Sequence, residues 1–285
     1  MFCLLIGLAA LAVAVLSRVW RVGTTGRLGT QRNFTRMSYT PFTVTGAERK
    51  GPWVIACDHA ANTVPPFING GSLDLPAGDM GRHIAYDVGA KGVSLALGAL
   101  LDAPVICSNF SRLVIDPNRG EDDPTLLMKL YDGTIIPANR HADATEKERR
   151  LDACHRPYHR ALGALLDARE APALLTLHSF TPQLSGRPKR PWHVGVLHAD
   201  DKRLSDPLLA LLHQDQTLCV GRNEPYGGHL PGDTVDTHAI ARGRHNTLVE
   251  IRNDLIQTDE QQAEWAKRLA PTLQEALRIT LENEA

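Results

Sequence analysis

The fold of this chain is constrained most strongly by three short apolar runs, at residues 53–57, 173–177 and 247–252. Their length and aliphatic content predict buried strands. Segments with the apolar spacing of amphipathic helices lie between or after them, among them residues 80–101 and the stretch from about Asp259 to the C-terminus. Strands that alternate with helices predict an α/β fold.

Further elements follow from the same patterns. Short apolar runs predict strands at residues 104–107, 113–115, 193–197 and 218–220. Thr145, with Glu148 three residues later, predicts a capped helix that continues towards Glu170 and that Pro157 should kink or divide. Residues 120–143 and 223–236 predict loops of the kind that carry function.

Polar residues stand at the ends of these strands, where ligands collect in an open α/β sheet. His59 follows the first run, His178 follows the second, and Glu250 interrupts the third. Imidazole is a common zinc ligand, and a carboxylate can act as a base towards the water of a metal site. The three residues together predict a metal-dependent hydrolase.

The composition argues against several other classes. Lys plus Arg number 31 and Asp plus Glu number 32, so no strong field draws the chain to nucleic acid, and a small-molecule substrate fits. The five cysteines lack a Cys-x-x-Cys pair, which favours a reducing compartment over a disulfide framework. The sequence contains no Gly-x-Ser-x-Gly elbow, Walker loop or dinucleotide fingerprint.

The N-terminal region differs from the rest of the chain. Residues 2–16 are almost wholly apolar, but no basic residue precedes them, and the run is shorter than the roughly 20 residues of a membrane-spanning helix. Three interpretations stay open: an atypical signal or anchor, a marginal membrane helix, or a translated leader before the true start. We take residues 1–36 as a leader, residues 37–285 as one catalytic domain, and the location as cytoplasmic, with a membrane-anchored or exported protein as the alternative.

Seven ordered segments carry a resemblance to a known family. They lie at residues 57–62, 83–87, 111–119, 157–159, 178–182, 223–226 and 249–252. In these segments the chain resembles the N-formylglutamate amidohydrolases, in particular their predicted branch, which are related to zinc carboxypeptidases and aspartoacylases. The resemblance implies a three-layer α/β domain around a mixed sheet, similar to zinc exopeptidases. It also implies Zn²⁺ or another divalent metal and an N-acyl amino acid as substrate, such as N-formyl-L-glutamate.

The resemblance also implies a metal site. His59 and His178 match the two histidine ligands of the wider group. That group has His-x-x-Glu where this chain has Asn62 in place of the glutamate, and a neutral amide is a weak zinc ligand. His83 and Asp87, four positions apart on the predicted helix, are alternatives to Asn62 as the third ligand. They could equally cap that helix or hydrogen-bond the loop that carries His59.

The remaining roles follow from the same resemblance. Residues 116–119 resemble the Asp-Leu-Asn-Arg motif of aspartoacylases, in which Asn118 and Arg119 would hold the substrate carboxylate and Asp116 would orient an arginine. Arg112 would stabilise the oxyanion of the tetrahedral intermediate. Glu250 would be the general base, and its alternative role is an ion pair with Arg252 or another buried arginine.

Further pocket contacts are expected from His159, Asn223 and Tyr226, and Ser179 is expected behind them. Two rival functions remain open from the sequence. One is a related zinc hydrolase that acts on a peptide or cell-wall fragment, which an exported N-terminus would favour. The other is a non-catalytic binding protein on the same fold, which the asparagine at position 62 would favour. The oligomeric state is not predicted.

Overall fold

The computed structural model describes residues 39–76, 78–228 and 230–285. Residues 39–285 form one compact unit, and it is this unit that we describe. The predicted leader, residues 1–36, and the proposed start at Met37 lie outside the described residues. In the part of the chain that is described, no helix combines the length and apolar character needed to cross a membrane.

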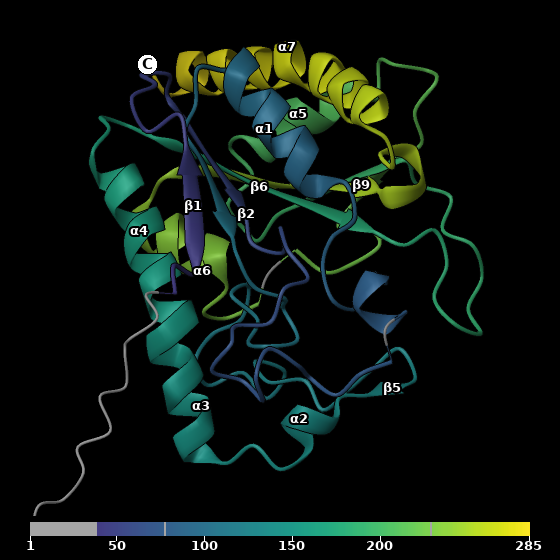
Figure 1. Cartoon of the computed structure of the whole chain (residues 1–285). Coiled ribbons are helices and arrows are strands. Elements are labelled where there is room, and N and C mark those ends of the chain that lie inside the picture. The colour runs from purple at the N-terminus through teal and green to yellow at the C-terminus, as the bar shows by residue number, and fades with distance from the viewer. Residues whose placement is uncertain (1–38, 77, 229) are drawn as a thin grey trace, which may run out of the picture. The chain divides into compact units, whose positions relative to one another are not determined.

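A seven-stranded sheet runs through the molecule in the order β1-β3-β2-β6-β9-β7-β8 (Figure 1). The four inner strands next to one another, β3, β2, β6 and β9, are parallel, whereas β1 and the β7–β8 pair run antiparallel to their neighbours β3 and β9. The sheet is therefore mixed, as expected. Its strands are β1 Phe42–Thr45, β2 Trp53–Cys57, β3 Val105–Ser108, β6 Ala173–Phe180, β7 Val194–Leu197, β8 Val220–Arg222 and β9 His245–Arg252.

Helices cover both faces of this sheet and give the three layers that the sequence predicted (Figure 1). On one face lie α1 (Ala90–Leu100), α5 (Ser205–Leu212) and α7 (Asp259–Glu284), and on the other lie α4 (Arg156–Asp167) and α6 (Thr234–His238). The sequence prediction of α7 is confirmed, and its first turn carries a capping box between Thr258 and Gln261. Trp53, Leu97 and Leu273 belong to the core under α7.

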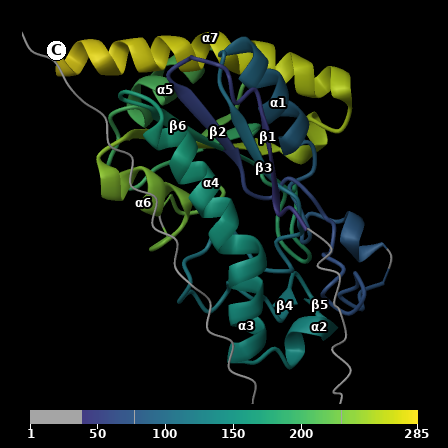
Figure 2. The ribbon, with the colours of Figure 1, turned by 60° about the vertical axis from the view of Figure 1, so that its left-hand side comes forward.

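A separate apolar cluster lies beyond the sheet, in the lower part of Figure 2. It includes Ile84, Leu113 and Ile136, all fully buried. The short elements here are the 3₁₀ turn Asp79–Gly81, the hairpin of β4 (Leu130–Tyr131) and β5 (Thr134–Ile135), α2 (Pro137–Arg140) and α3 (Ala144–Arg150). The predicted polar loop 120–143 thus contains a hairpin and a helix.

Two predicted elements differ from the observed ones in ways that bear on the site: one is shorter than predicted and the other is not a strand. Of residues 80–101, only α1 is an α-helix, because Gly89 before it has a left-handed backbone with φ 81°. His83 and Asp87 therefore do not share a helix face. Residues 113–115 form a buried turn in place of a strand, and their carbonyl groups accept hydrogen bonds from Asn139 and Arg150 side chains.

The helix after this region begins earlier than predicted. Asp143, not Thr145, is the N-cap of α3, because its carboxylate accepts the backbone N–H of Glu146. The predicted division of the helix is confirmed: a π-helical turn, Leu151–His155, separates α3 from α4, and Pro157 lies in the first turn of α4. Strand β8 starts at Val220, two residues later than predicted, and β1 was not predicted.

Candidate active site

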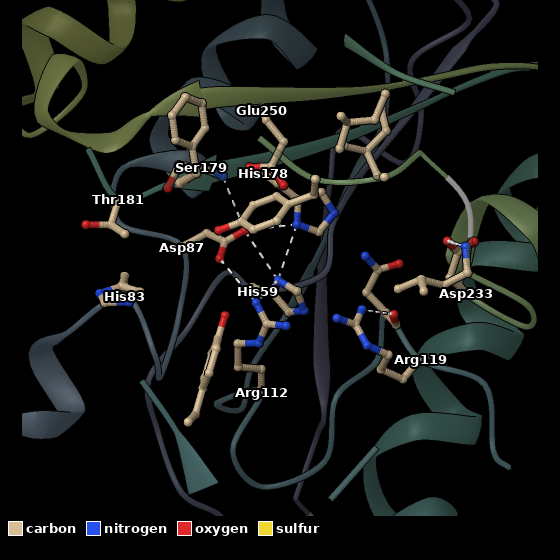
Figure 3. A pocket seen from close by; sticks show the side chains of 18 residues that line it. His59, His83, Asp87, Arg112, Arg119, His178, Ser179, Thr181, Asp233 and Glu250 are labelled. Atoms are coloured by element: carbon tan, nitrogen blue, oxygen red, sulfur yellow. Dashed lines mark hydrogen bonds and ion pairs between the residues drawn. The ribbon is translucent and has the colours of Figure 1, made fainter. Parts of the chain in front are cut away.

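Three side chains meet at the carboxyl ends of β2 and β6. His59 is the second residue after β2. His178 lies near the carboxyl end of β6, the parallel neighbour of β2. The Nδ1 atoms of the two rings are 3.2 Å apart, and Asp87 Oδ2 lies 3.3 Å from the first and 2.9 Å from the second. These atoms form one group suited to holding a metal ion, and Figure 3 shows the three side chains pointing towards one another.

Carboxylates hold the far side of each ring. His59 Nε2 lies 2.7 Å from Asp116 Oδ1, and His178 Nε2 lies 3.3 Å from Asp58 Oδ2. Asp58 is itself fixed by the Tyr158 hydroxyl, which donates to Oδ1 at 2.6 Å. A proton on Nε2 leaves the Nδ1 lone pair directed at the shared centre, which is the usual arrangement behind metal-ligating histidines.

The charges of this cluster do not balance within the protein. Burial alone would raise the pKa of Asp58, Asp87 and Asp116, but the histidines, and Arg112 beside Asp116, hold all three pKa values below their ordinary value. Three buried carboxylates thus face one guanidinium. A divalent cation, or protons on both histidines, would neutralise the difference.

The donor set fits a metal. Four-coordinate zinc with ligands at 2.0–2.1 Å places its ligand atoms about 3.3 Å apart, close to the observed separations of 2.9, 3.2 and 3.3 Å. Two imidazoles and one carboxylate are ordinary zinc ligands, and three protein ligands leave a coordination position for water or substrate.

Glu250 stands beside this group on β9. It is the register partner of His178 on β6, so both side chains lie on the same face of the sheet. The carboxylate is buried and its Oε2 has no hydrogen-bond partner. Burial raises the pKa of Glu250 to about 7, against the opposing charge of His178. A carboxyl with this pKa can both accept and donate a proton near neutral pH.

Arg112 lies on the other side of the histidines. Its Nη2 donates to Asp116 at 2.6 Å, and its Nη1 lies 3.3 Å from His59 Nδ1. The Nε atom is buried without a hydrogen-bond partner. The guanidinium is therefore held against the candidate metal-ligand group, and its Nε–H remains available as a donor.

Asn118 and Arg119 line the same pocket. Asn118 Oδ1 accepts the backbone N–H of Thr234, which leaves the amide nitrogen as the group available to a ligand. Arg119 Nη1 donates to the carbonyl of Asn118, and its Nε donates to Thr125. In Figure 3, Arg119 lies across the pocket from His83.

The other predicted residues lie in different surroundings. Asn62 donates to the carbonyl of Met80 and is not among the residues that line the pocket. His83 lines the pocket but pairs with Asp132, at 3.4 Å. Among the three candidates for the third ligand, the structure brings Asp87 to the two histidines.

The two pocket residues predicted in the loop after β8 also lie in different surroundings. Tyr226 lines the pocket, whereas Asn223 accepts the backbone N–H of His198. His159 lies behind residues 117–119, with its two ring nitrogens 2.9 Å from the Pro117 carbonyl and from His238.

Sequence reasoning missed some of the supporting groups. Asp58 and Tyr158 fall within the matching segments 57–62 and 157–159, but the sequence analysis assigns neither of them a role. Ser179 was expected behind the site, but it lines the pocket, and its backbone N–H lies 3.3 Å from Asp87 Oδ2. The signal that could have found Asp58 was its place directly before a predicted ligand at a strand end.

Comparison with known proteins assigns the family. The family model described as N-formylglutamate amidohydrolase matches residues 51–257. A gene product of Agrobacterium tumefaciens has a crystal structure with a TM-score of 0.80 and 34% identity, over 84% of this chain and 96% of that chain. N-formylglutamate amidohydrolase from Ralstonia eutropha JMP134 shares the fold, with a TM-score of 0.61 and 22% identity, over 85% of this chain and 97% of that chain.

No curated protein matches the chain. The family match covers most of the sequence, and it includes the pocket residues His59, Asp87, Asn118, Arg119, His178 and Glu250. The chain therefore belongs to the N-formylglutamate amidohydrolase family and is a hydrolase that acts on an amide bond.

Proposed function

We propose that the chain is a metal-dependent amidohydrolase of N-acyl amino acids, and that N-formyl-L-glutamate, cleaved to L-glutamate and formate, is its first candidate substrate. The observation that carries this proposal is the triangle of His59 Nδ1, His178 Nδ1 and Asp87 Oδ2, with sides of 2.9 to 3.3 Å. Zn²⁺ is the first candidate for the ion, because imidazole and carboxylate suit it. The family match supports the amide substrate.

The metal, when bound, would polarise the substrate carbonyl and make the attacking water more acidic. Glu250 accepts a proton from that water as its oxygen attacks the carbonyl carbon. The same carboxyl then donates the proton to the nitrogen of the amide as the C–N bond breaks, which releases the acid and the free amine. The pKa of Glu250, raised to about 7 mainly by burial, suits both steps.

Positive charge and hydrogen-bond donors assist these steps. Arg112, held by Asp116, faces the region in which negative charge develops on the carbonyl oxygen. Asn118 and Arg119 bind the carboxylate of the amino acid, for which a guanidinium is the best-matched side chain. Tyr226 completes the pocket wall.

The test combines metal analysis with turnover. Protein purified without chelators should hold about one zinc per chain and release formate from N-formyl-L-glutamate. Glu250→Gln should keep the metal and lose about 10²-fold or more in kcat, as expected for a missing proton-transfer group. Turnover by Glu250→Gln at the wild-type rate would exclude the role given to this carboxylate, and a metal-free, inactive wild-type protein would exclude the proposed function.

We also propose a reducing, cytoplasmic location. Four cysteines of the described residues, Cys57, Cys107, Cys154 and Cys219, are free thiols, as is usual in that compartment. Cell fractionation, together with mass spectrometry of the mature N-terminus, tests this point. Recovery in the membrane fraction, or cleavage after an exported leader, would favour the alternative.

A further inference from the structure

The segment of residues 116–119 serves two parts of the pocket at once. The carboxylate of Asp116 holds His59 and Arg112, while the side chains of Asn118 and Arg119 line the pocket. The segment is neither helix nor strand. Its carbonyl groups therefore need hydrogen-bond donors, and donors from elsewhere in the fold help to fix the backbone from which the two side chains project.

Two histidines supply the short hydrogen bonds to the carbonyl groups of Pro117 and Arg119, and the Thr234 hydroxyl adds a longer one to Pro117, at 3.5 Å. His155 Nε2 lies 2.9 Å from the carbonyl oxygen of Arg119, and His159 Nε2 lies 2.9 Å from that of Pro117. A carbonyl oxygen only accepts, so in each ring the Nε2 atom must carry the proton. The two residues are four positions apart, one at the end of the π-helical turn and one in α4, so they face the segment together.

A third histidine, His238, holds the ring of His159 in place. The ring of His238 of α6 lies nearly parallel to that of His159, with planes 9° apart and ring centroids 5.1 Å apart, and its Nε2 lies 2.9 Å from His159 Nδ1. Because His159 Nδ1 carries no proton in this tautomer, His238 donates to it. Donation thus runs in one direction, from His238 to His159 and from His159 to Pro117.

These rings are neutral near neutral pH. Burial lowers the pKa of His159 to about 3 and that of His238 to about 4, and it also lowers the pKa of His155. The hydrogen bonds to the 116–119 segment therefore add no charge to the neighbouring pocket. They act on backbone position alone.

We propose that His155 and His159 are positioning residues for substrate binding. They fix the backbone of residues 117–119 so that Asn118 and Arg119 are already arranged to receive a carboxylate, which lowers the entropic cost of binding. The inference rests on the proposed function in one respect, namely that Asn118 and Arg119 hold the carboxylate of the substrate. Neither histidine touches the substrate or the reacting atoms.

Paired substitutions in the full-length, metal-loaded protein test the inference. His159→Leu and His155→Leu remove the donor, whereas His159→Gln and His155→Gln keep an N–H group at the end of a side chain of similar reach. Loss of one such hydrogen bond should raise KM for N-formyl-L-glutamate about tenfold in the leucine variants. The metal content and kcat should stay at the wild-type level, and the glutamine variants should recover most of the affinity.

A matched control lies far from the pocket. His213, exposed at the end of α5, also bonds a backbone carbonyl, that of Leu209 at 2.6 Å. His213→Leu removes a hydrogen bond of the same kind and should leave KM unchanged. A parallel comparison uses the substrate with its α-carboxylate converted to an amide. The preference of the wild-type enzyme for the carboxylate should shrink in His159→Leu.

A binding measurement separates failure of the inference from failure of the proposed function. Calorimetric titration of the metal-loaded protein with L-glutamate probes the same two side chains without turnover, and its Kd should rise about tenfold in the leucine variants. An unchanged KM and Kd in metal-loaded leucine variants would overturn the inference while the hydrolase activity stands. Loss of metal and kcat together, not recovered by glutamine, would also overturn it, because the histidines would then support the fold as a whole. An inactive wild-type protein that still binds L-glutamate would refute the proposed function alone.

Discussion

The molecule contains two groups of histidines with opposite surroundings. His59 and His178 lie between carboxylates, and the pKa of His178 is raised above its ordinary value because Asp58 and Asp87 outweigh the effect of burial. His159 faces the Pro117 carbonyl and the ring of His238, and burial lowers the pKa of both histidines. The same side chain is thus prepared to bind a cation in one place and to act as a neutral donor in the other.

The difference lies in the group that contacts the Nε2 atom of each ring: a carboxylate for His59 and His178, and a backbone carbonyl for His159. A carboxylate behind Nε2 makes Nδ1 a better electron donor towards a metal, whereas a carbonyl only orients the ring and adds no net charge. The polar partners of a histidine, and not its burial alone, therefore separate a candidate ligand from a structural residue. Four predictions test this comparison.

The largest effect is expected at the metal ligands. His178→Ala removes one of the three proposed ligand atoms and leaves Asp58 and Asp87 without their common partner, so bound metal should be lost and turnover should fall about 10³-fold or more. Elemental analysis and formate release measure both. Retention of one metal ion per chain in this variant would contradict the distinction between the two groups of histidines, because His178 would then not be needed for metal binding.

A smaller loss is expected when the carboxylate behind a ligand is neutralised. Asp116→Asn keeps the shape of the side chain but not its charge, and should weaken metal affinity about 10- to 100-fold. Competition with a chelator gives the affinity. Tyr158→Phe removes only the hydroxyl that fixes Asp58, so it should also weaken metal affinity, but by a smaller factor. An affinity that is unchanged in Asp116→Asn would mean that the negative charge behind His59 does not tune the site.

The third prediction concerns the side of the pocket that we propose to bind the substrate carboxylate. Arg119→Lys keeps the charge but loses the planar pair of donors that matches a carboxylate, so KM should rise about tenfold with little change in kcat. Steady-state kinetics on N-formyl-L-glutamate separates the two constants. A fall in kcat with constant KM would place Arg119 in the chemical step.

The smallest effect is on stability as a function of pH. The pKa of His159 in the folded protein, about 3, lies below the value of about 6.5 in the unfolded chain. Between these values the unfolded state binds more protons, so the contribution of this residue to stability is complete above about pH 6.5 and is lost as the pH falls. His159→Gln should therefore flatten the decline in Tm between pH 7 and pH 5.

In metal-free protein, His178 of the first group should make stability depend on pH in the opposite direction. Because the pKa of His178 is raised, its contribution is complete below the unfolded value of about 6.5 and is lost as the pH rises through the folded pKa. Thermal melts of metal-free protein across the same pH range check this contrast. An identical pH dependence of Tm for His178→Gln and His159→Gln would contradict the distinction between the two groups.

Much of the fold, and part of the site, follow from strand patterns. The runs that became β2, β6 and β9 are short, aliphatic and buried, so the sequence predicts three strands, with His59 and His178 at the ends of two of them and Glu250 within the third. The structure brings these three residues to one pocket. Their catalytic roles remain proposals.

Other parts depend on contacts that no local pattern encodes. Asp87 reaches the histidines because its backbone N–H donates to the carbonyl of His59, at 2.9 Å, in a loop that helical spacing suggested was a helix. The donors that hold residues 117 and 119 come from positions 42 and 36 residues further along the chain. Tertiary contacts of this kind override local preference and cannot be derived from spacing.

The register between β6 and β9 has a consequence for how this enzyme tolerates change. His178 and Glu250 are direct partners along eight consecutive pairs, and side chains alternate between the two faces of a strand. Insertion or deletion of one residue inside either strand would turn one of the two side chains to the opposite face of the sheet, whatever the length of the connecting loops. Changes of length in the connecting loops leave the pair intact, so variation among related enzymes should be found in those loops and not within the two strands.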